Sequence, residues 1–324
     1  MEAELIERAG IPFETIPAAG VHGVGLRALP NNLLRLARGV AASRRILESF
    51  RPEVLFFTGG YLAAPMAVAG MRLPTMLYVP DIEPALALKA LSFFADSIAV
   101  TAEDSLKFFP RSKRIRVTGY PLRADLANWS RQDAIQRLGL SSSLPTLLAY
   151  GGSKGARSIN MAVLKRLKDF LEMAQLIHIT GSLDWPTVKA EAEKLPPDLQ
   201  ARYHAMPYLH DMGAAFASAD LVVSRAGAST LGEFPLFGLP AILVPYPHAW
   251  RYQKVNADYL AQRGAAIILQ DRLLESDLYA AVRVLFDNPA KRESMRLAMQ
   301  ALSRPAAAST IADLLLELCG EKTP

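Results

Sequence analysis

Residues 221–256 restrict the fold of this chain more than any other stretch, because a helix there stands between two short apolar runs. The runs are residues 221–224 and 241–244, and continuous apolar segments of this length are typical of strands buried on both faces of a parallel sheet. Residues 226–229 contribute little side-chain bulk where the first run enters the helix. The stretch therefore predicts a strand–helix–strand unit of an α/β fold.

Polar side chains follow both apolar runs. After the first run come Arg225, Gly227, Ser229, Thr230 and Glu233, and after the second come residues 245–253. Ligands of open α/β sheets bind outside the carboxyl ends of the strands, so we expect these residues to face one crevice. The alternative is an ordinary turn between strand and helix with no ligand.

Glycine-rich turns recur at two other expected strand ends. The motif GGSKGAR occupies residues 151–157 after an apolar run at residues 146–150, and Gly59-Gly60-Tyr61 follows another such run. Glycines let the backbone turn tightly, and a helix that starts directly afterwards presents unpaired N–H groups to a phosphate. Residues 151–157 are therefore a candidate pyrophosphate-binding loop, whereas a glycine pair alone is weak support.

The composition fits a globular chain with two cores. It has 324 residues, 51% of them hydrophobic, which is enough for two domains. A single cysteine excludes a disulfide framework and a cysteine-based zinc site, and the five histidines show no paired ligand spacing, so we expect no metal and no cofactor. The N-terminus lacks the pattern of a secretory signal. The longest apolar tract is interrupted by Pro65, Arg72 and Pro74 and is not predicted to span a membrane.

A basic segment without acidic residues lies between residues 107 and 123. Its cations are Lys107, Arg111, Lys113, Arg114, Arg116 and Arg123. Such a segment suits anionic lipid or phosphate, and a solvated basic face is the alternative. No nucleic-acid-binding module is visible, so nucleic acid is not an expected partner.

Apolar periodicity and turn residues predict the remaining elements. A helix stopped by Gly10 and a strand at residues 11–16 come first, and Asp211 is expected to cap a helix at residues 213–218. Further strands are expected at residues 54–58, 75–79, 97–101, 115–118 and 175–180, and the segment at residues 203–209 leads into residues 210–212. Further helices are expected at residues 33–50, 131–138, 275–286, 289–302 and 306–318.

The motifs SRAGASTLGE at residues 224–233 and GLPAILVPYP at residues 238–247, with Gln253 and Asn256, resemble the donor-site signature of the MurG family. These are GT-B glycosyltransferases that move N-acetylglucosamine from UDP to undecaprenyl-pyrophosphoryl-muramyl-pentapeptide. The resemblance implies an α/β fold of two Rossmann-like domains whose parallel sheets face a cleft.

The resemblance also implies a division of the chain. Residues 1–122 form the acceptor-side domain and residues 123–324 the donor-side domain. Family chains open with a strand, a glycine-rich loop, a helix and another strand, and we expect the first domain here to lack that opening. A final helix of GT-B folds commonly returns to the first domain, and residues 306–319 fit this role or that of a peripheral helix.

Roles for individual residues follow from the same resemblance. The donor site comprises Gly152, Ser153, Gly155, Leu209, Arg225, Gly227, Ala228, Ser229, Thr230, Glu233 and Gln253. Leu209 offers its backbone to uracil, Glu233 accepts hydrogen bonds from the ribose hydroxyls, and Gln253 reads hydroxyls of the sugar. Arg123 neutralises charge on the departing diphosphate. The acceptor-side loop comprises Gly59, Gly60 and Tyr61.

The chain departs from the family at the acceptor loop, where YVPD at residues 78–81 stands in place of His-Glu-Gln-Asn. Asp81 and Glu83 lie in this loop after an expected strand, where a carboxylate can take a proton from an acceptor hydroxyl. They are the candidate catalytic bases, and a solvated loop acid is the alternative for each. Trp250 and Tyr252 also depart from the pattern, so nucleotide recognition is better supported than sugar selectivity.

These expectations combine into one function, that of a metal-independent, inverting hexosyltransferase. It would move N-acetylglucosamine from UDP-N-acetylglucosamine to a polyprenyl-pyrophosphate-linked muramyl-peptide acceptor in peptidoglycan synthesis. The family implies a cytoplasmic protein, peripheral on the inner face of the cell membrane. Candidate membrane contacts are Leu73, Phe93, Phe94, Phe108, Phe109, Lys107, Arg111 and Lys113. The alternatives are a GT-B enzyme with another acceptor, a UDP-sugar epimerase, and a catalytically inactive nucleotide-sugar-binding fragment.

Overall fold

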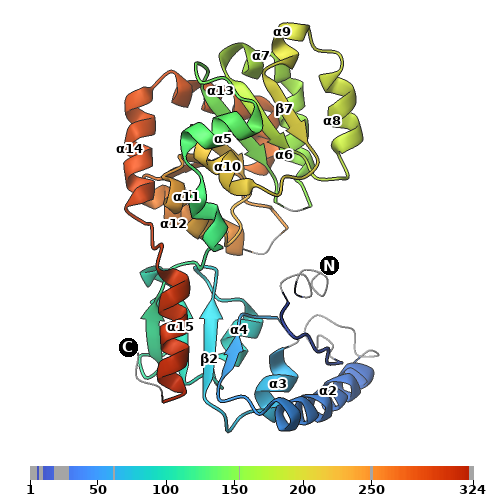
Figure 1. The fold of residues 1–324 in the computed structure, drawn as a ribbon, viewed down its shortest axis with the longest axis vertical. Helices are drawn as coiled ribbons and strands as arrows, with labels where there is room; N and C mark the ends of the chain where they lie inside the picture. The colour runs from blue at the N-terminus through green and yellow to red at the C-terminus, as the bar shows by residue number, and fades with distance from the viewer. Residues whose placement is uncertain are drawn as a thin grey trace.

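The computed structural model describes residues 6, 10–17, 29–60, 63–152, 154–248 and 251–320. Within them the chain forms two parallel sheets, each covered by helices (Figure 1). The strand order is β1-β2-β3-β4 in one sheet and β10-β9-β8-β5-β6-β7 in the other. The predicted α/β class with two parallel sheets is confirmed.

The first sheet is small, and its central strands are buried. Its strands are β1 (Leu55–Phe57), β2 (Thr75–Val79), β3 (Ser97–Val100) and β4 (Arg114–Val117). Every residue of β2 and β3 is buried, as the continuous apolar runs predict. The elements that connect or precede these strands are α2 (Leu29–Phe50), α3 (Ala63–Ala69), α4 (Leu86–Leu91) and the 3-10 helix η1 (Glu103–Phe108).

The second sheet is larger and has a core on each face. Its strands are β5 (Thr146–Tyr150), β6 (Gln175–Ile179), β7 (Tyr203–Met206), β8 (Leu221–Ser224), β9 (Ala241–Leu243) and β10 (Ala266–Ile268). Its helices are η2 (Ala124–Asn128), α5 (Arg131–Leu138), α6 (Arg157–Lys165), α7 (Leu167–Met173), α8 (Trp185–Ala192), α9 (Pro197–Gln200), α10 (Met212–Ser218), α11 (Thr230–Phe237), α12 (Tyr252–Gln262), η3 (Asp271–Leu273), α13 (Leu274–Phe286) and α14 (Pro289–Gln300).

The strand order of the second sheet reverses between β5 and β8. The chain runs outward from β5 through β6 to β7, then crosses back to start β8 on the other side of β5. Open α/β sheets bind ligands at such a reversal, outside the carboxyl ends of the strands. The two small-residue turns of the sequence follow β5 and β8 directly, so the topology brings them side by side.

The last helix, α15 (Ala307–Leu318), returns from the second sheet to the first. Its Ile311 and Leu314 pack with Met76, Tyr78 and Ala99 on β2 and β3, and Figure 1 shows it lying along β2. Gly119, which follows β4, is so close to the segment before α15 that an added Cβ would lie 2.6 Å from the Cβ of Arg304. The chain therefore passes between the two sheets twice, and the two passages touch.

Two local expectations were wrong. Residues 11–17 have no regular secondary structure, although a strand was predicted for residues 11–16. Ile11 and Phe13 are exposed there, and a strand without a partner is not stable in water. Asp211 does not cap α10; its carboxylate instead accepts a hydrogen bond from Arg137 at 2.8 Å.

Candidate functional site

A cavity of about 1120 Å³ opens at the carboxyl ends of β5, β8 and β9. Three loops contribute to its wall, one after each strand. Its lining includes Gly151, Gly152 and Gly155 from the first loop, Arg225, Gly227, Ser229 and Thr230 from the second, and Tyr246, Pro247, His248 and Gln253 from the third. The structure thus brings together the two polar groups that the sequence placed after separate strands.

The loop after β5 is a tight backbone turn. Gly152 and Gly155 have φ values of +88° and +77°, and the N–H of Gly155 donates to the carbonyl of Gly152 at 2.9 Å. A Cβ on Gly155 would lie 2.1 Å from the carbonyl oxygen of Thr180. Helix α6 then starts with its first residues in the cavity wall, where unpaired N–H groups attract an anion. Ser153 lies outside the described residues.

The turn after β8 leaves open space over its backbone. An added Cβ on Gly227 would meet nothing within 4 Å, so a ligand can approach the main chain closely. Thr230 fixes the turn, since its hydroxyl donates to the carbonyl of Gly227 at 2.7 Å. Ala228 is half-buried in the same turn. The turn before α11 therefore offers a second stretch of accessible backbone next to the glycine loop, although the N–H groups of residues 230–233 already donate to carbonyls of the turn.

Arg225 lines the cavity, but internal partners occupy its guanidinium. It donates to the Asp271 carboxylate, to the Ser158 hydroxyl at 2.8 Å and to the carbonyl of Val244 at 3.2 Å. It also lies over the ring of Tyr246, 5.1 Å from the centroid. Arg225 thus ties the three loops of the cavity wall together, and its direct role toward a donor stays a prediction.

Glu233 lies in the first turn of α11 and is hydrogen-bonded to Ser229, whose hydroxyl donates at 2.9 Å. Burial raises the pKa of the Glu233 carboxyl, and the Ser229 hydrogen bond and the charge of Arg123 act in the opposite direction. Arg123 itself is exposed and lies 3.5 Å from Asp125. Its charge is therefore close enough to act on Glu233 while its guanidinium stays open to solvent.

The third loop adds Gln253 and a histidine that sequence reasoning missed. The side-chain carbonyl of Gln253 accepts from the backbone N–H of Tyr246 at 2.8 Å, and its NH2 group has no hydrogen-bond partner among the described residues. His248 lines the cavity next to Tyr246, with ring centroids 5.4 Å apart. The sequence indicated His248 only as one of residues 245–253, which were expected to face the crevice. Leu209 is half-buried against the core and is outside the cavity lining.

The acceptor loop after β2, which carries Asp81 and Glu83, contacts the second domain. The side-chain NH2 of Asn256 on α12 donates to Asp81 Oδ1 at 2.7 Å. Burial raises the pKa of Asp81, and the Asn256 hydrogen bond opposes this. Glu83 is buried and forms ion pairs with Arg251 and Lys89, and mainly the hydrogen bond from Arg251 lowers its pKa. Asp81, whose pKa is raised, is therefore a better candidate for the catalytic base than Glu83, whose pKa is lowered.

The other acceptor-side predictions are described only in part. Gly59 and Gly60 follow β1 with φ values of +128° and +83°, so the backbone turn needs glycine at both positions. Tyr61 and Trp250 lie outside the described residues. The described residues contain no group of side chains arranged to hold a metal ion.

The predicted membrane-contact residues are divided between surface and core. Phe93 is 80% exposed and Phe94 is 39% exposed, whereas Phe109 is buried at 7% exposure. The inclusion of Phe109 was therefore wrong, because it packs in the core of the first sheet. Leu73 and Phe108 are half-buried against the same core. Among the described helices, none is long and apolar enough to cross a membrane.

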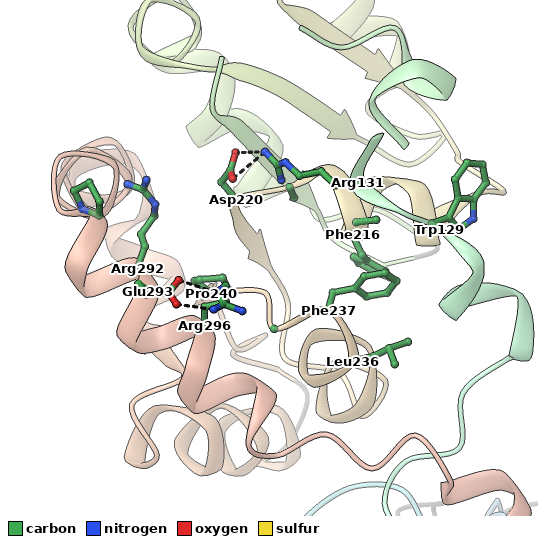
Figure 2. Close-up of a pocket in the computed structure, with 14 residues that line it drawn as sticks. Trp129, Arg131, Phe216, Asp220, Leu236, Phe237, Pro240, Arg292, Glu293 and Arg296 are labelled. Carbon is green, nitrogen blue, oxygen red and sulfur yellow. Dashed lines mark hydrogen bonds and ion pairs between the residues drawn. The ribbon is translucent and has the colours of Figure 1, made fainter. Parts of the chain in front are cut away.

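A second cavity, of about 630 Å³, lies at the amino ends of β8 and β9 (Figure 2). Its charged side chains are satisfied within the protein. Arg131 pairs with Asp220 at 2.9 Å and Arg296 pairs with Glu293, as the dashed lines of Figure 2 show. Arg292 donates to two backbone carbonyls at the end of α13. This cavity therefore offers no free charge to a ligand.

Two parallel α/β sheets facing one another, with a glycine loop and helix amino ends around a cavity, define the GT-B class of two-domain proteins. The chain belongs to glycosyltransferase family 28, and within it to the MurG family. The family's C-terminal domain model matches residues 146–311 and its N-terminal domain model matches residues 1–100.

Individual relatives agree with this assignment. The UDP-N-acetylglucosamine--N-acetylmuramyl-(pentapeptide) pyrophosphoryl-undecaprenol N-acetylglucosamine transferase of Roseiflexus sp. (strain RS-1) is 38% identical over 356 residues, covering 97% of this chain and 81% of the relative. The crystal structure of Acinetobacter baumannii MurG superposes with a TM-score of 0.77 at 25% identity, over 98% of this chain and 88% of that one. The chain is therefore a glycosyltransferase.

An epimerase shares the fold at lower sequence identity. The UDP-GlcNAc 2-epimerase of Neisseria meningitidis, a structure bound to UDP-GlcNAc, superposes with a TM-score of 0.63 at 12% identity. It covers 98% of this chain and 88% of the epimerase chain. At this identity the likeness shows the common architecture alone.

Proposed function

We propose that the chain transfers N-acetylglucosamine from UDP-N-acetylglucosamine to a polyprenyl-pyrophosphate-linked muramyl-peptide, a step of peptidoglycan synthesis. The observation that carries this proposal is the cavity at the strand-order reversal, where two small-residue turns and two helix amino ends meet. This arrangement suits a diphosphate, and the names of the relatives supply the sugar and the acceptor.

For the donor, we assign the diphosphate to the space between the two turns, with Gly152, Ser153 and Gly155 on one side and Gly227, Ala228, Ser229 and Thr230 on the other. Glu233 accepts hydrogen bonds from the ribose hydroxyls, and the backbone of Leu209 contacts uracil. The free amide of Gln253 donates to a sugar hydroxyl. Arg225 holds the walls of this site in place.

For the chemistry, the acceptor hydroxyl attacks the anomeric carbon from the face opposite the UDP, which inverts the configuration. The bond between the sugar and the diphosphate breaks, and Asp81 takes the proton of the attacking hydroxyl. Arg123 and the helix amides stabilise the negative charge that collects on the departing UDP. Gly59, Gly60 and Tyr61 contribute the acceptor side of the cleft.

For the location, we propose that the chain acts at the cytoplasmic face of the cell membrane. Phe93 and Phe94 project from the first domain, and Lys113 lies next to them, donating to the carbonyls of Phe93 and Ala95. Exposed aromatic rings with an adjacent cation suit the interface of an anionic bilayer. We also propose that the domains divide at residue 122, directly before Arg123.

Calorimetry with UDP-N-acetylglucosamine, UDP-glucose and GDP-mannose tests the donor site. We expect binding of the first and at least tenfold weaker binding of the others, about 1.4 kcal/mol. Incubation with radiolabelled donor and lipid-linked acceptor should then give labelled lipid product, and Asp81→Asn should slow its formation about 100-fold or more to a residual rate, with donor affinity retained. Epimerised donor in the absence of acceptor, or no donor binding, would contradict the proposal.

A further inference from the structure

Asn256 on α12 joins three segments of the chain through one buried amide. Its NH2 group donates to Asp81 Oδ1 at 2.7 Å and to the carbonyl of Ala226 at 3.2 Å. Its carbonyl oxygen accepts from the backbone N–H of Ile82 at 3.1 Å. The side chain has no exposed surface, and both of its donors and its acceptor are used.

The three segments belong to the two sides of the cleft. Asp81 and Ile82 lie in the loop after β2, whereas Ala226 directly precedes Gly227, which lines the donor cavity. Helix α12 also carries Gln253, three residues before Asn256, and residues with this spacing lie on one helix face. One helix face therefore borders the donor cavity and holds the loop that carries Asp81.

A second contact anchors the same loop. Glu83 is 3% exposed and is bonded to Arg251 at the start of α12 and to Lys89 on α4. Asp81 is thus followed directly by two anchored residues, Ile82 bonded to Asn256 and Glu83 bonded to Arg251. Its Oδ1 is held, and its Oδ2 has no hydrogen-bond partner among the described residues.

We propose that Asn256 is a positioning residue for the transfer reaction, which fixes Asp81 Oδ1 and so leaves Oδ2 to take the proton of the acceptor hydroxyl. The ion pair of Arg251 with Glu83 is the second anchor of the loop. This inference rests on the proposed function wherever activity is the readout. The titratable groups that face Asp81 are Tyr78 and Tyr120.

A double-mutant cycle tests the positioning role. Asn256→Ala should lower kcat by about tenfold, because a catalytic group displaced by a fraction of an ångström loses its alignment. The donor KM should change by less than about twofold. In an Asp81→Asn background the same change should lower kcat no further. An equal loss in both backgrounds would overturn the inference.

The pH dependence separates positioning from a merely structural role. Asn256 hydrogen-bonds the charged form of Asp81 and so lowers its pKa; removing the amide raises that pKa. The acid limb of the kcat profile should therefore move to higher pH in Asn256→Ala, and further in Asn256→Asp, where a second carboxylate lies beside the first. Lys254→Gln, on the exposed side of α12 and paired only with Asp258, should leave the profile unchanged. An unshifted limb in both Asn256 variants would contradict the inference.

Arg251→Gln covers the case in which the buried variants do not fold, since the Arg251 side chain is 62% exposed. It should lower kcat with the donor KM unchanged, and an unchanged kcat would count against the anchored loop. A parent chain that transfers no sugar would refute the proposed function instead. The inference is then tested by a carboxyl 13C titration of Asp81, which should show a higher pKa in Asn256→Ala; an equal pKa would refute it.

Discussion

The two ends of the six-stranded sheet both carry a cavity, and they differ in which groups line it. At the carboxyl end the lining combines glycines, small residues and the amino end of α6 with charged side chains, among which Arg157 pairs with Asp184 and Arg225 with Asp271. At the amino end the charged side chains also neutralise one another, Arg131 with Asp220 and Arg296 with Glu293. The accessible backbone of the glycine turns, rather than charge, therefore distinguishes the ligand site: an added Cβ on Gly152 or Gly227 would meet nothing within 4 Å, whereas one on Gly238 at the amino end would lie 2.5 Å from Gln300.

The largest effect should come from Gly155→Ala at the carboxyl end. The new Cβ would lie 2.1 Å from the Thr180 carbonyl oxygen in a backbone with φ of +77°, so the loop must open. We expect donor affinity to fall about 100-fold or more, measured by calorimetry. Gly264→Ala is the matched control, because its φ is +74° and its Cβ would meet nothing within 4 Å. Similar donor affinities in Gly155→Ala and Gly264→Ala would show that the loop at Gly155 does not bind the donor.

Glu233→Gln should have the next largest effect. Hydrogen bonds to a charged group contribute about 1.5–3 kcal/mol, so the donor KM should rise about 10- to 100-fold if the ribose hydroxyls bind this carboxylate. Ser229→Ala keeps the Glu233 carboxylate and removes the hydrogen bond that Ser229 donates to it, together with the Ser229 hydroxyl at the cavity wall, and should raise KM less. The measurement is steady-state kinetics with saturating acceptor. A KM unchanged in Glu233→Gln would remove Glu233 from the donor site.

Behind the carboxyl-end cavity, His178 should make stability depend on pH. It is bonded to Tyr203 at 2.8 Å and Asn160 at 3.0 Å, and burial lowers its pKa to about 3, with the charge of Asp184 opposing. Between about pH 6.5 and about pH 3, His178 is protonated in the unfolded chain but neutral in the folded chain. The folded state therefore loses stability as the pH falls through this window. At pH 5 the loss amounts to about 2 kcal/mol.

Urea unfolding at pH 7 and pH 5 measures this loss. The decrease in the free energy of unfolding between the two pH values should be smaller in His178→Gln than in the parent. His210→Gln, which changes an exposed histidine, should leave the decrease as it is. Equal decreases in all three proteins would show that His178 is not the group responsible.

The smallest effect should come from the amino-end cavity. Arg131→Gln removes a partly exposed ion pair with Asp220, and such pairs contribute about 0.2–1 kcal/mol. We expect a loss of that size in thermal unfolding and no change in donor KM. Asp220 is left in place because it also accepts from the backbone N–H of Thr146. A raised KM would show that the paired cavity does take part in function.

The parts of the fold that depend on local pattern were predictable. Strands at residues 75–79, 146–150 and 221–224 and the helix at residues 131–138 have the predicted bounds. Each is an apolar or amphipathic run bounded by glycine, proline or polar residues, and Gly139 ends its helix with φ of +65°, as expected. The resemblance to MurG supplied the pairing of the two domains, which the pattern alone does not contain.

The parts that depend on distant residues were not predictable. Asn256 and Asp81 are 175 positions apart in sequence, and nothing local marks them as partners. Arg225 was predicted to belong to the donor site, and nothing local indicates that its guanidinium is bonded to Asp271, which lies 46 positions away. Phe109 looked like a surface aromatic because it stands in a basic segment, although its ring fills the first core.

The contact between Gly119 and Arg304 has a mechanical consequence. With a single connecting segment, one domain could rotate about the other in any direction. Two connecting segments that touch at one place leave mainly one rotation axis, which passes through their contact. That rotation then governs how the loop that carries Asp81 meets α12 of the other domain. An added Cβ at position 119 would lie only 2.6 Å from the Cβ of Arg304. A bulky side chain there would therefore push the two connecting segments apart and change the angle between the domains.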